Sequence, residues 1–338
     1  MASSTTTRKA DRALVIGGTL FIGRALVRRL LARGDHVTIL HRGTYNPFAD
    51  ETADICCDRN DVDAIAEELS GGGFDVVYDN VYDWQRGTTP EQVKAAALAV
   101  APGLRRYVLT SSVAAYGEGL GHSEDDALAP ADHPEDYVRN KAETERMLFG
   151  LHSDNGFPAT TLRPPYVYGP ENPFYREAFF WDRILAGRPI LLPGDGERLM
   201  QFVLADDIAR AAILAADTNA ASGRAYNIAH ESPLTQRVLV ESLAAAAGMR
   251  AELIPVAREL LVELGGNLFE PPFYFAQYFD MPPITQKTDR ARSELGLEAT
   301  PWPQGVQQTY DWYQAQDRVR ADFSFDDKVL GALKSDQN

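Results

Sequence analysis

Short apolar runs alternate with amphipathic stretches through the first half of the chain. The apolar runs are typical of strands that are buried on both faces of a parallel sheet. They cover Ala13–Gly18, Val37–Leu40, Asp54–Cys57, Asp75–Asn80, Arg106–Ser112 and Ala159–Pro165. Between them, apolar side chains recur at helical spacing in Phe21–Arg33, Val62–Leu69, Glu91–Val100 and Tyr137–His152. This alternation predicts an α/β fold built on a doubly wound parallel sheet.

The pattern changes after Tyr168. Aromatic and proline-rich stretches, Phe174–Trp181 and Phe269–Pro283, interrupt the alternation, and no internal repeat or low-complexity segment is present. A chain of 338 residues also exceeds the usual size of one domain. We therefore expect a second, smaller domain that lies over the C-terminal edge of the sheet.

The charge of the chain bears on its partners. Its 33 basic and 48 acidic residues give a formal net charge of −15. Such a surface repels the phosphates of nucleic acids and acidic lipid headgroups, so we expect no nucleic-acid partner and no membrane partner. Cys56 and Cys57 are adjacent in a strand-like run and point to opposite faces, which favours neither a disulfide nor a metal site. With a polar start at Met1–Lys9 and no membrane-length apolar run, these features predict a cytoplasmic protein with a frayed N-terminus.

A glycine-rich turn follows the first predicted strand and precedes the first predicted helix. Its sequence is Gly17-Gly18-Thr19-Leu20-Phe21-Ile22-Gly23. Glycines at such a turn let the backbone approach a pyrophosphate, whose charge is bound by the free amides of the helix N-terminus. All seven positions are therefore candidate cofactor-binding residues, although Leu20 stands where the usual fingerprint has its middle glycine. A tight strand–helix turn without a ligand is the competing interpretation.

Two residues at the ends of the next strands bear on the choice of cofactor. An acidic side chain after the second strand would bind the ribose 2′-hydroxyl of NAD, whereas an arginine can pair with the 2′-phosphate of NADP. The strand ends in His41 and Arg42, which favours NADP and leaves NAD open; an exposed arginine without a ligand is the alternative. Asp58, after the third strand, is placed either to contact the adenine amine or to cap the helix that begins near Asp61.

Tyr137 and Lys141 are the first candidates for proton chemistry. Residues four apart lie on one face of a helix, so the phenol and the ammonium point into the same space. A nearby cation favours the phenolate and should lower the tyrosine pKa toward the operating pH. A solvated pair on the surface of a helix would show the same spacing.

Several motifs occur together in order along the chain. They are Gly17–Gly23, Thr110–Gly117, Tyr137-x-x-x-Lys141, Leu162–Pro170, and Gly194-Asp195-Gly196 followed by Asp206-Asp207. In these motifs the chain resembles the extended short-chain dehydrogenase/reductase family, in its NAD(P)-dependent epimerase/dehydratase branch. The glycine turn has the atypical Gly-Gly-Thr-x-Phe-Ile-Gly form. The resemblance covers Arg12–Tyr313.

The resemblance implies roles for individual residues. Ser112, 25 positions before Tyr137, corresponds to the serine that hydrogen-bonds the substrate oxygen. Tyr137 would be the general acid or base, and Lys141 would hold the nicotinamide ribose and stabilise the phenolate. The other positions implied at the site are Pro164 and Val167 for the cofactor, and Tyr166 and Arg198 for the substrate.

The resemblance also implies an organisation into domains. Residues 11–173 and 200–232 would form the dinucleotide-binding Rossmann domain, and residues 174–199 and 233–315 a smaller α/β substrate domain. Residues 1–10 would be a disordered terminus and residues 316–338 a C-terminal tail. Members of the family are often dimers through a helix bundle that would include Glu91–Val100 and Tyr137–His152, so a homodimer is left open.

Departures from the family narrow the expected reaction. Its dehydratases carry Asp-Glu directly after the catalytic hydroxyl residue, where this chain has Val113-Ala114, so dehydration is not expected. Decarboxylation loses support as well, because related decarboxylases carry glutamate where Ala114 stands. Met200 occupies the position of an arginine that binds the diphosphate in sugar-nucleotide epimerases, and Arg198 lies two residues away, on the same face of an extended segment.

These observations predict an NAD(P)-dependent oxidoreductase or epimerase. It would act on a sugar or a related secondary alcohol or ketone by hydride transfer, with a tyrosine as acid or base and without a metal. A cofactor-binding sensor without catalysis and an RNA-binding member of the same superfamily are the alternatives. The aromatic residues of Phe174–Trp181 would either stack on the substrate or pack between the two domains.

Overall fold

The centre of the protein is a seven-stranded parallel sheet. The structure is a computed structural model that describes residues 9–43, 45–318 and 320–335. Across the sheet the strands run β12 (Arg224–Asn227), β7 (Ala159–Arg163), β5 (Arg106–Thr110), β4 (Val76–Asp79), β1 (Arg12–Ile16), β2 (His36–His41) and β3 (Ala53–Cys56). All neighbouring pairs are parallel. The predicted doubly wound α/β fold is confirmed, and β12 is an edge strand that the apolar pattern did not indicate.

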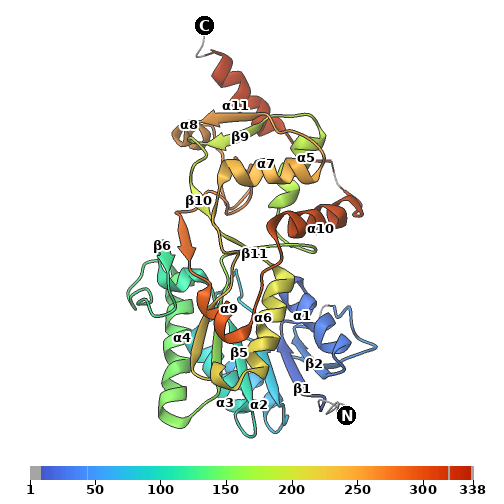
Figure 1. The fold of residues 1–338 in the computed structure, drawn as a ribbon, viewed down its shortest axis with the longest axis vertical. Coiled ribbons are helices and arrows are strands. Elements are labelled where there is room, and N and C mark those ends of the chain that lie inside the picture. The colour runs from blue at the N-terminus through green and yellow to red at the C-terminus, as the bar shows by residue number, and fades with distance from the viewer. Residues whose placement is uncertain (1–8, 44, 319, 336–338) are drawn as a thin grey trace, which may run out of the picture.

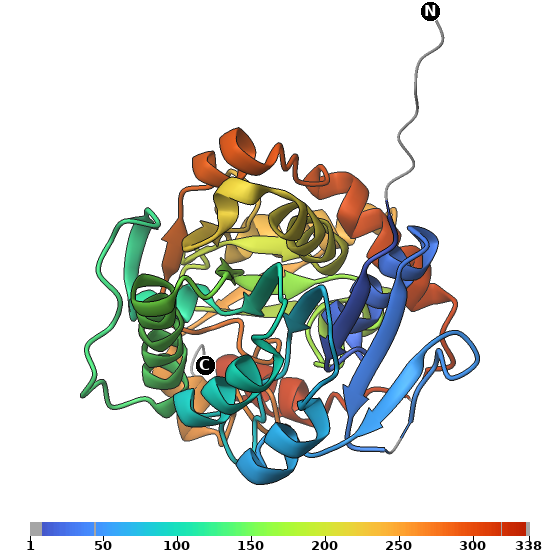
Figure 2. The same ribbon diagram turned by 90° about the horizontal axis from the view of Figure 1, so that it is seen from below.

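Helices cover both faces of this sheet (Figure 2). One face packs against α1 (Phe21–Ala32) and α6 (Ala205–Asp217), and the other against α2 (Val62–Leu69), α3 (Pro90–Val100) and α4 (Asp136–Asn155). Side chains alternate along β1, so that Ala13 and Val15 join the first core and Leu14 and Ile16 the second. Continuous burial on both faces explains why these strands read as unbroken apolar runs.

The smaller domain lies above the sheet in Figure 1. It contains α5 (Glu177–Leu185), β9 (Ile190–Pro193), α7 (Gln236–Ala246), β14 (Leu253–Val256), α8 (Arg258–Glu263), α10 (Trp302–Gln314) and α11 (Ser324–Ser335). These elements surround an aromatic core that includes Phe180, Trp181, Phe275 and Phe279. Most of the Phe174–Trp181 cluster therefore packs inside this domain.

Helix α11 lies within residues 316–338, which we expected to be a tail. Phe325 and Val329 of α11 are buried in the aromatic core, and Asp326 accepts two hydrogen bonds from the buried Arg183 of α5 at 3.0 and 2.9 Å. The sequence of this region is mostly polar, and the two buried apolar residues of α11 are enough to dock this short helix. The expected domain boundaries stay predictions, and residues 1–8 of the expected disordered terminus lie outside the described residues.

Short elements join the two domains near the carboxyl ends of the sheet strands. Strand β8 (Tyr166–Tyr168) pairs with β11 (Phe202–Leu204), and β6 (Gly119–His122) pairs with β15 (Ile284–Gln286). The remaining elements are β10 (Leu199–Met200), β13 (Leu234–Thr235), α9 (Asp289–Leu295) and two 3₁₀ turns, Val113–Tyr116 and Asn219–Ala221. Within the described ranges, no helix is long and apolar enough to span a bilayer.

Candidate active site

The glycine-rich turn joins β1 to α1 with very little space around its backbone. Gly17 has a φ of 83°, and its N–H donates to the carbonyl of Leu40 at 3.0 Å. A Cβ on Gly23 would lie 1.8 Å from the Gly17 carbonyl oxygen, and one on Gly17 would lie 2.2 Å from Val81. Leucine at the N-cap position, residue 20, offers no side-chain cap to the first amides of α1. This tight turn with uncapped amides fits the pyrophosphate of a dinucleotide.

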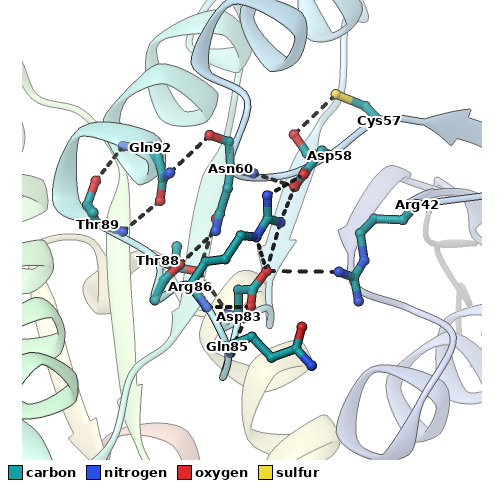
Figure 3. Close-up of polar contacts among 11 residues, drawn as sticks. Arg42, Cys57, Asp58, Asn60, Asp83, Gln85, Arg86, Thr88, Thr89 and Gln92 are labelled. Carbon is teal, nitrogen blue, oxygen red and sulfur yellow. Dashed lines mark hydrogen bonds and ion pairs between the residues drawn. The ribbon is translucent and has the colours of Figure 1, made fainter.

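Arg42 lies at the outer end of β2, beside two carboxylates and a second arginine (Figure 3). Its side chain is 67% exposed, and its Nη1 is 3.9 Å from Asp83 Oδ2. Arg86 joins this group, with nitrogens 2.7 Å from Asp83 Oδ2 and 2.8 Å from Asp58 Oδ2. The structure therefore places Arg42, the residue predicted to pair with a 2′-phosphate, in a cluster of two arginines and two aspartates.

Asp58 does not cap α2, which corrects one of the two roles considered for it. The N-cap of α2 is Asp61, whose side chain accepts a hydrogen bond from the N–H of Ala64 at 3.0 Å. Asp58 instead accepts from the N–H of Asn60 and pairs with Arg86, and these bonds hold its pKa below the ordinary value. Asp61 is the residue directly before the helix, so the standard capping geometry selects it.

Ser112, Tyr137 and Lys141 meet at the carboxyl end of β5 and the start of α4. The Ser112 hydroxyl accepts a hydrogen bond from the N–H of Ala114 at 3.1 Å and acts on the Tyr137 phenol in the direction that lowers its pKa, and Lys141 Nζ lies 5.8 Å from the centre of the Tyr137 ring. Lys141 Nζ donates to the carbonyl of Thr110 at 2.9 Å, which fixes the lysine against the last residue of β5. The three predicted catalytic side chains are thus together in the structure.

The expected effect of Lys141 on the phenol is not observed. Burial raises the pKa of Tyr137 to about 12, while the neighbouring Ser112 hydroxyl and the charge of Arg176 act in the opposite direction. Burial also lowers the pKa of Lys141 to about 8. The interpretation from the sequence counted the charge of the lysine but not the desolvation of both groups, which is the larger effect here.

A buried polar network lies behind these residues and fixes α4 against the sheet. Glu145, two turns after Tyr137, accepts hydrogen bonds from Ser111 at 2.5 Å, from Thr161 at 2.9 Å and from Arg163 at 2.6 Å. Glu145 is fully buried and Arg163 is 3% exposed. Ser111 precedes Ser112, and Glu145 lies on the same helix as Tyr137. The network therefore fixes the segments that carry Ser112 and Tyr137 relative to each other.

Two aromatic side chains contact Tyr137 and two more pack against one of these, and sequence reasoning missed most of the four. Tyr82 contacts the Tyr137 ring edge-on with centroids 4.7 Å apart, and Trp84 stacks on it at 4.8 Å. Phe174 and Tyr278 contact Trp84 at 6.0 and 6.2 Å. Tyr82 and Trp84 follow β4, and the position of that strand end at the ligand-binding edge of the sheet was a signal that could have identified them.

The two residues predicted to contact the substrate, Tyr166 and Arg198, differ in their surroundings. Tyr166 lies near this site, and burial raises its pKa to about 12. Arg198 donates to the carbonyl oxygens of Asp280 and Met281 at 3.1 and 2.9 Å, and Met200 is buried in the core of the smaller domain. The guanidinium of Arg198 therefore serves contacts within the protein.

Pro164 and Val167 lie where the chain crosses from the sheet to the smaller domain. The carbonyl of Pro164 accepts from the N–H of Val113 at 2.9 Å, directly beside Ser112. Val167 is in β8 and pairs with Val203. The following loop is tied to α1, because Glu171 pairs with Arg24 and Arg28 at 2.9 and 2.7 Å.

The sequence is similar to those of known proteins. Residues 13–229 match the model of the NAD dependent epimerase/dehydratase family. The chloroplast stem-loop binding protein of 41 kDa b from Arabidopsis thaliana is 30% identical over 341 residues, covering 94% of this chain and 84% of that protein. A bovine sterol-4-alpha-carboxylate 3-dehydrogenase, decarboxylating, from Bos taurus is 28% identical over 244 residues, covering 67% of each chain.

Solved structures share the fold. A UDP-glucose 4-epimerase from Thermotoga maritima, solved with UDP-glucose, superposes with a TM-score of 0.73 at 21% identity, covering 90% of this chain and 98% of that one. MoeE5 in complex with UDP-glucose and NAD gives a TM-score of 0.69 at 23% identity, with 90% and 98% covered. At these identities the likeness shows the architecture alone.

Proposed function

Because the chain belongs to the NAD dependent epimerase/dehydratase family, we propose that it is an NAD(P)-dependent oxidoreductase or epimerase that acts on a sugar or a related secondary alcohol or ketone. The observation that carries this proposal is the meeting of Ser112, Tyr137 and Lys141 at the sheet edge that also carries the glycine turn. A sensor that only binds cofactor would have no use for a partly buried phenol placed beside a serine and a lysine. The intact trio therefore favours catalysis.

The roles of the three residues follow from their surroundings. The Ser112 hydroxyl would hydrogen-bond the substrate oxygen beside the Tyr137 phenol, which gives its proton to a carbonyl in reduction and takes one from an alcohol in oxidation. Lys141, fixed to the Thr110 carbonyl, would bind the nicotinamide ribose through its remaining donors. The nicotinamide cofactor, when bound, supplies or accepts the hydride.

The cofactor we propose is NADP, with NAD as the alternative. The exposed guanidinium of Arg42 and the neighbouring Arg86 support it, because both can reach an anion at the end of β2. The acidic partners Asp58 and Asp83 already balance part of this positive charge. A direct comparison of NADP and NAD affinity is therefore the test of this choice.

We further propose that the enzyme is not a dehydratase. Val113 and Ala114 follow Ser112 in a 3₁₀ turn, and neither side chain can transfer a proton. Elimination of water needs an acid and a base beside the substrate. Epimerisation by transient oxidation, or a one-way reduction or oxidation, remains compatible with these residues.

RNA binding is the second candidate, and one observation favours it. The Arabidopsis relative that covers most of this chain is described as a stem-loop binding protein. Against it stands the net charge of −15, which repels phosphate backbones.

The deciding experiment is the identification by mass spectrometry of a cofactor that co-purifies with the full chain. It should be followed by a substrate screen at the nicotinamide absorbance, run beside an assay that resolves epimers, because an epimerase that recycles its cofactor gives no net absorbance change. A bound nicotinamide dinucleotide and turnover that depends on Tyr137 would support the proposal. Salt-sensitive RNA binding without cofactor would support the second candidate instead.

A further inference from the structure

Arg176 is a buried arginine whose charge the protein leaves unpaired. It lies at the start of α5 and is 8% exposed. A guanidinium has five N–H donors. Its recorded hydrogen bond runs from Nη1 to the carbonyl of Val167 at 3.2 Å, its Nε is buried without a partner, and it forms no ion pair with any carboxylate in the described part of the chain. Most of its hydrogen-bonding capacity is therefore unused.

The surroundings of Arg176 connect it to the proposed catalytic tyrosine. Its guanidinium carbon lies 4.6 Å from the centre of the Phe174 ring and 5.7 Å from that of Tyr278. Both rings contact Trp84, which stacks on Tyr137. The charge of Arg176 acts on the Tyr137 and Tyr166 phenols, and burial lowers the pKa of Arg176 itself. Arg176 thus lies one layer of rings away from the proton-transfer group.

Other nearby charges do not fully compensate this cation. Glu177 is adjacent and its charge raises the pKa of Arg176, but the two side chains form no ion pair within 4.0 Å. Burial raises the pKa of Glu177 to about 7, its Oε2 accepts from Asn172, and its Oε1 has no partner, so it compensates Arg176 only in part. Arg198 is committed to the carbonyls of Asp280 and Met281. Besides Lys141, which is held by the Thr110 carbonyl, the site therefore offers the buried guanidinium of Arg176 among aromatic rings, where a charge that is not fully compensated is costly.

We propose that Arg176 binds a carboxylate of the substrate, so that the enzyme acts on a carboxylated alcohol or ketone such as a sugar acid. This inference rests on the proposed function, because it takes the molecule on which Tyr137 acts as the ligand of Arg176. A single guanidinium matches a monoanion in charge, and its planar fork matches a carboxylate in shape. A phosphate monoester carries up to twice that charge and would leave part of it uncompensated in this apolar surrounding. The aromatic rings of Trp84, Phe174 and Tyr278 would cover the apolar part of the ligand.

The test compares acids with their neutral counterparts on the full chain loaded with NADP. Calorimetric titrations use D-glucuronate against D-glucose, and benzoate against benzamide, with glucose 6-phosphate as a phosphate probe. We expect at least one carboxylate to bind about tenfold or more tightly than its neutral counterpart. In Arg176→Met this ratio should fall to about one, whereas Arg176→Lys should keep part of it because the charge remains without the fork.

Arg183 provides a matched control on the same helix. It is also buried, but it is paired with Asp326. Arg183→Met should lower the melting temperature because it leaves a buried carboxylate unpaired, whereas Arg176→Met should leave the melting temperature unchanged or raise it.

Three binding results would overturn the inference. They are equal binding of acid and neutral ligand in the wild type, a carboxylate preference that survives in Arg176→Met, and a preference for the phosphate probe alone. A melting temperature for Arg176→Met as low as that of Arg183→Met would also overturn it by showing a structural role. These titrations need no turnover, so the failure of this inference is distinct from the failure of the proposed function, which is judged by cofactor binding and by Tyr137→Phe.

Discussion

Lys141 is buried and Tyr137 is partly buried, and loss of solvation shifts the pKa of each in the direction that favours the neutral form. With a pKa of about 12, the phenol is protonated across the physiological range and can serve directly as the acid for reduction of a carbonyl. In the oxidative direction the same group must first lose its proton. The groups that favour the phenolate, Ser112 and Arg176, therefore matter more for oxidation than for reduction.

Tyr137→Phe should lower kcat by about 10²–10⁴-fold and leave cofactor affinity unchanged. The change removes the phenolic proton and keeps the ring that packs against Tyr82 and Trp84. Steady-state kinetics and calorimetric titration with NADP measure the two quantities. Full activity of the variant at neutral pH would exclude Tyr137 as the acid or base.

Lys141 should make the protein more stable as the pH rises from about 8 to about 10.5. Its pKa in the folded protein is about 8, below the ordinary value of 10.5, so in this window the unfolded chain binds more protons and the slope is positive. The slope cannot exceed about 1.4 kcal/mol per pH unit. Urea unfolding at pH 8, 9 and 10 should show this rise in the wild type relative to Lys141→Met. Parallel curves for the two proteins would contradict it.

Arg42→Ala should weaken NADP binding by about 1.5–3 kcal/mol and leave NAD binding nearly unchanged, because only NADP carries a 2′-phosphate. Arg292→Ala is a suitable control, since Arg292 is also an exposed arginine paired with aspartate, in α9. Titration of each variant with both cofactors provides the measurement. Equal losses for NADP and NAD would show that Arg42 contacts a group common to both.

At the scale of elements, helices α1 and α4 contain glycines with opposite requirements. Gly23 in α1 lies close to the backbone of Gly17, and a Cβ on Gly23 would overlap the Gly17 carbonyl oxygen. Gly150 lies inside α4, where an added Cβ would meet nothing within 4 Å. The first glycine serves the cofactor turn, and the second only weakens its helix.

Gly150→Ala should therefore raise the free energy of unfolding by about 0.5–1 kcal/mol without changing cofactor affinity. Gly23→Ala should lower both the free energy of unfolding and cofactor affinity, since the turn must open to accept the methyl group. Urea unfolding and NADP titration distinguish the two variants. Unchanged cofactor affinity in Gly23→Ala would count against the pyrophosphate role of the turn.

The predictability of each element follows its burial. Strands such as β1 and β4 are buried on both faces, so their composition alone revealed them. Strand β12 lies at the sheet edge, and two of its four residues, Arg224 and Asn227, are polar, so it does not appear as an apolar run. Helix α11 was missed because it buries only two apolar side chains, Phe325 and Val329.

At the scale of the whole molecule, the site is assembled from segments far apart in the chain. Trp84 follows β4, whereas Tyr278 belongs to the smaller domain, and the two rings stack at 6.2 Å. Spacing along the sequence can identify Tyr137 and Lys141 because one helix carries both. It cannot identify contacts that depend on how the two domains meet, and Arg176 was missed for this reason.

The contacts of Arg198 and the uncharged side chain of Met200 predict weak binding of UDP-sugars. Met200 carries no charge, and Arg198 is held by Asp280 and Met281. Among the residues that the structure describes, neither side chain offers a free guanidinium at the position used for a diphosphate by the sugar-nucleotide epimerases that the chain resembles. Calorimetry with a UDP-hexose on the NADP-loaded protein should show weaker binding than with a small free substrate, and no 4,6-dehydratase product should form. Micromolar binding that Arg198→Ala abolishes would reveal a diphosphate site and refute this prediction.

Trp84, stacked on Tyr137, gives the protein a natural optical probe. The chain has four tryptophans. Trp181 is 1% exposed, with its indole N–H bonded to Leu243, so its emission should be insensitive to ligands, whereas Trp84 is 55% exposed beside the proposed site. Ligands that cover Trp84 should shift its fluorescence to shorter wavelength, and a bound reduced nicotinamide should quench it by energy transfer. Binding and release at this site can therefore be followed in real time without a label.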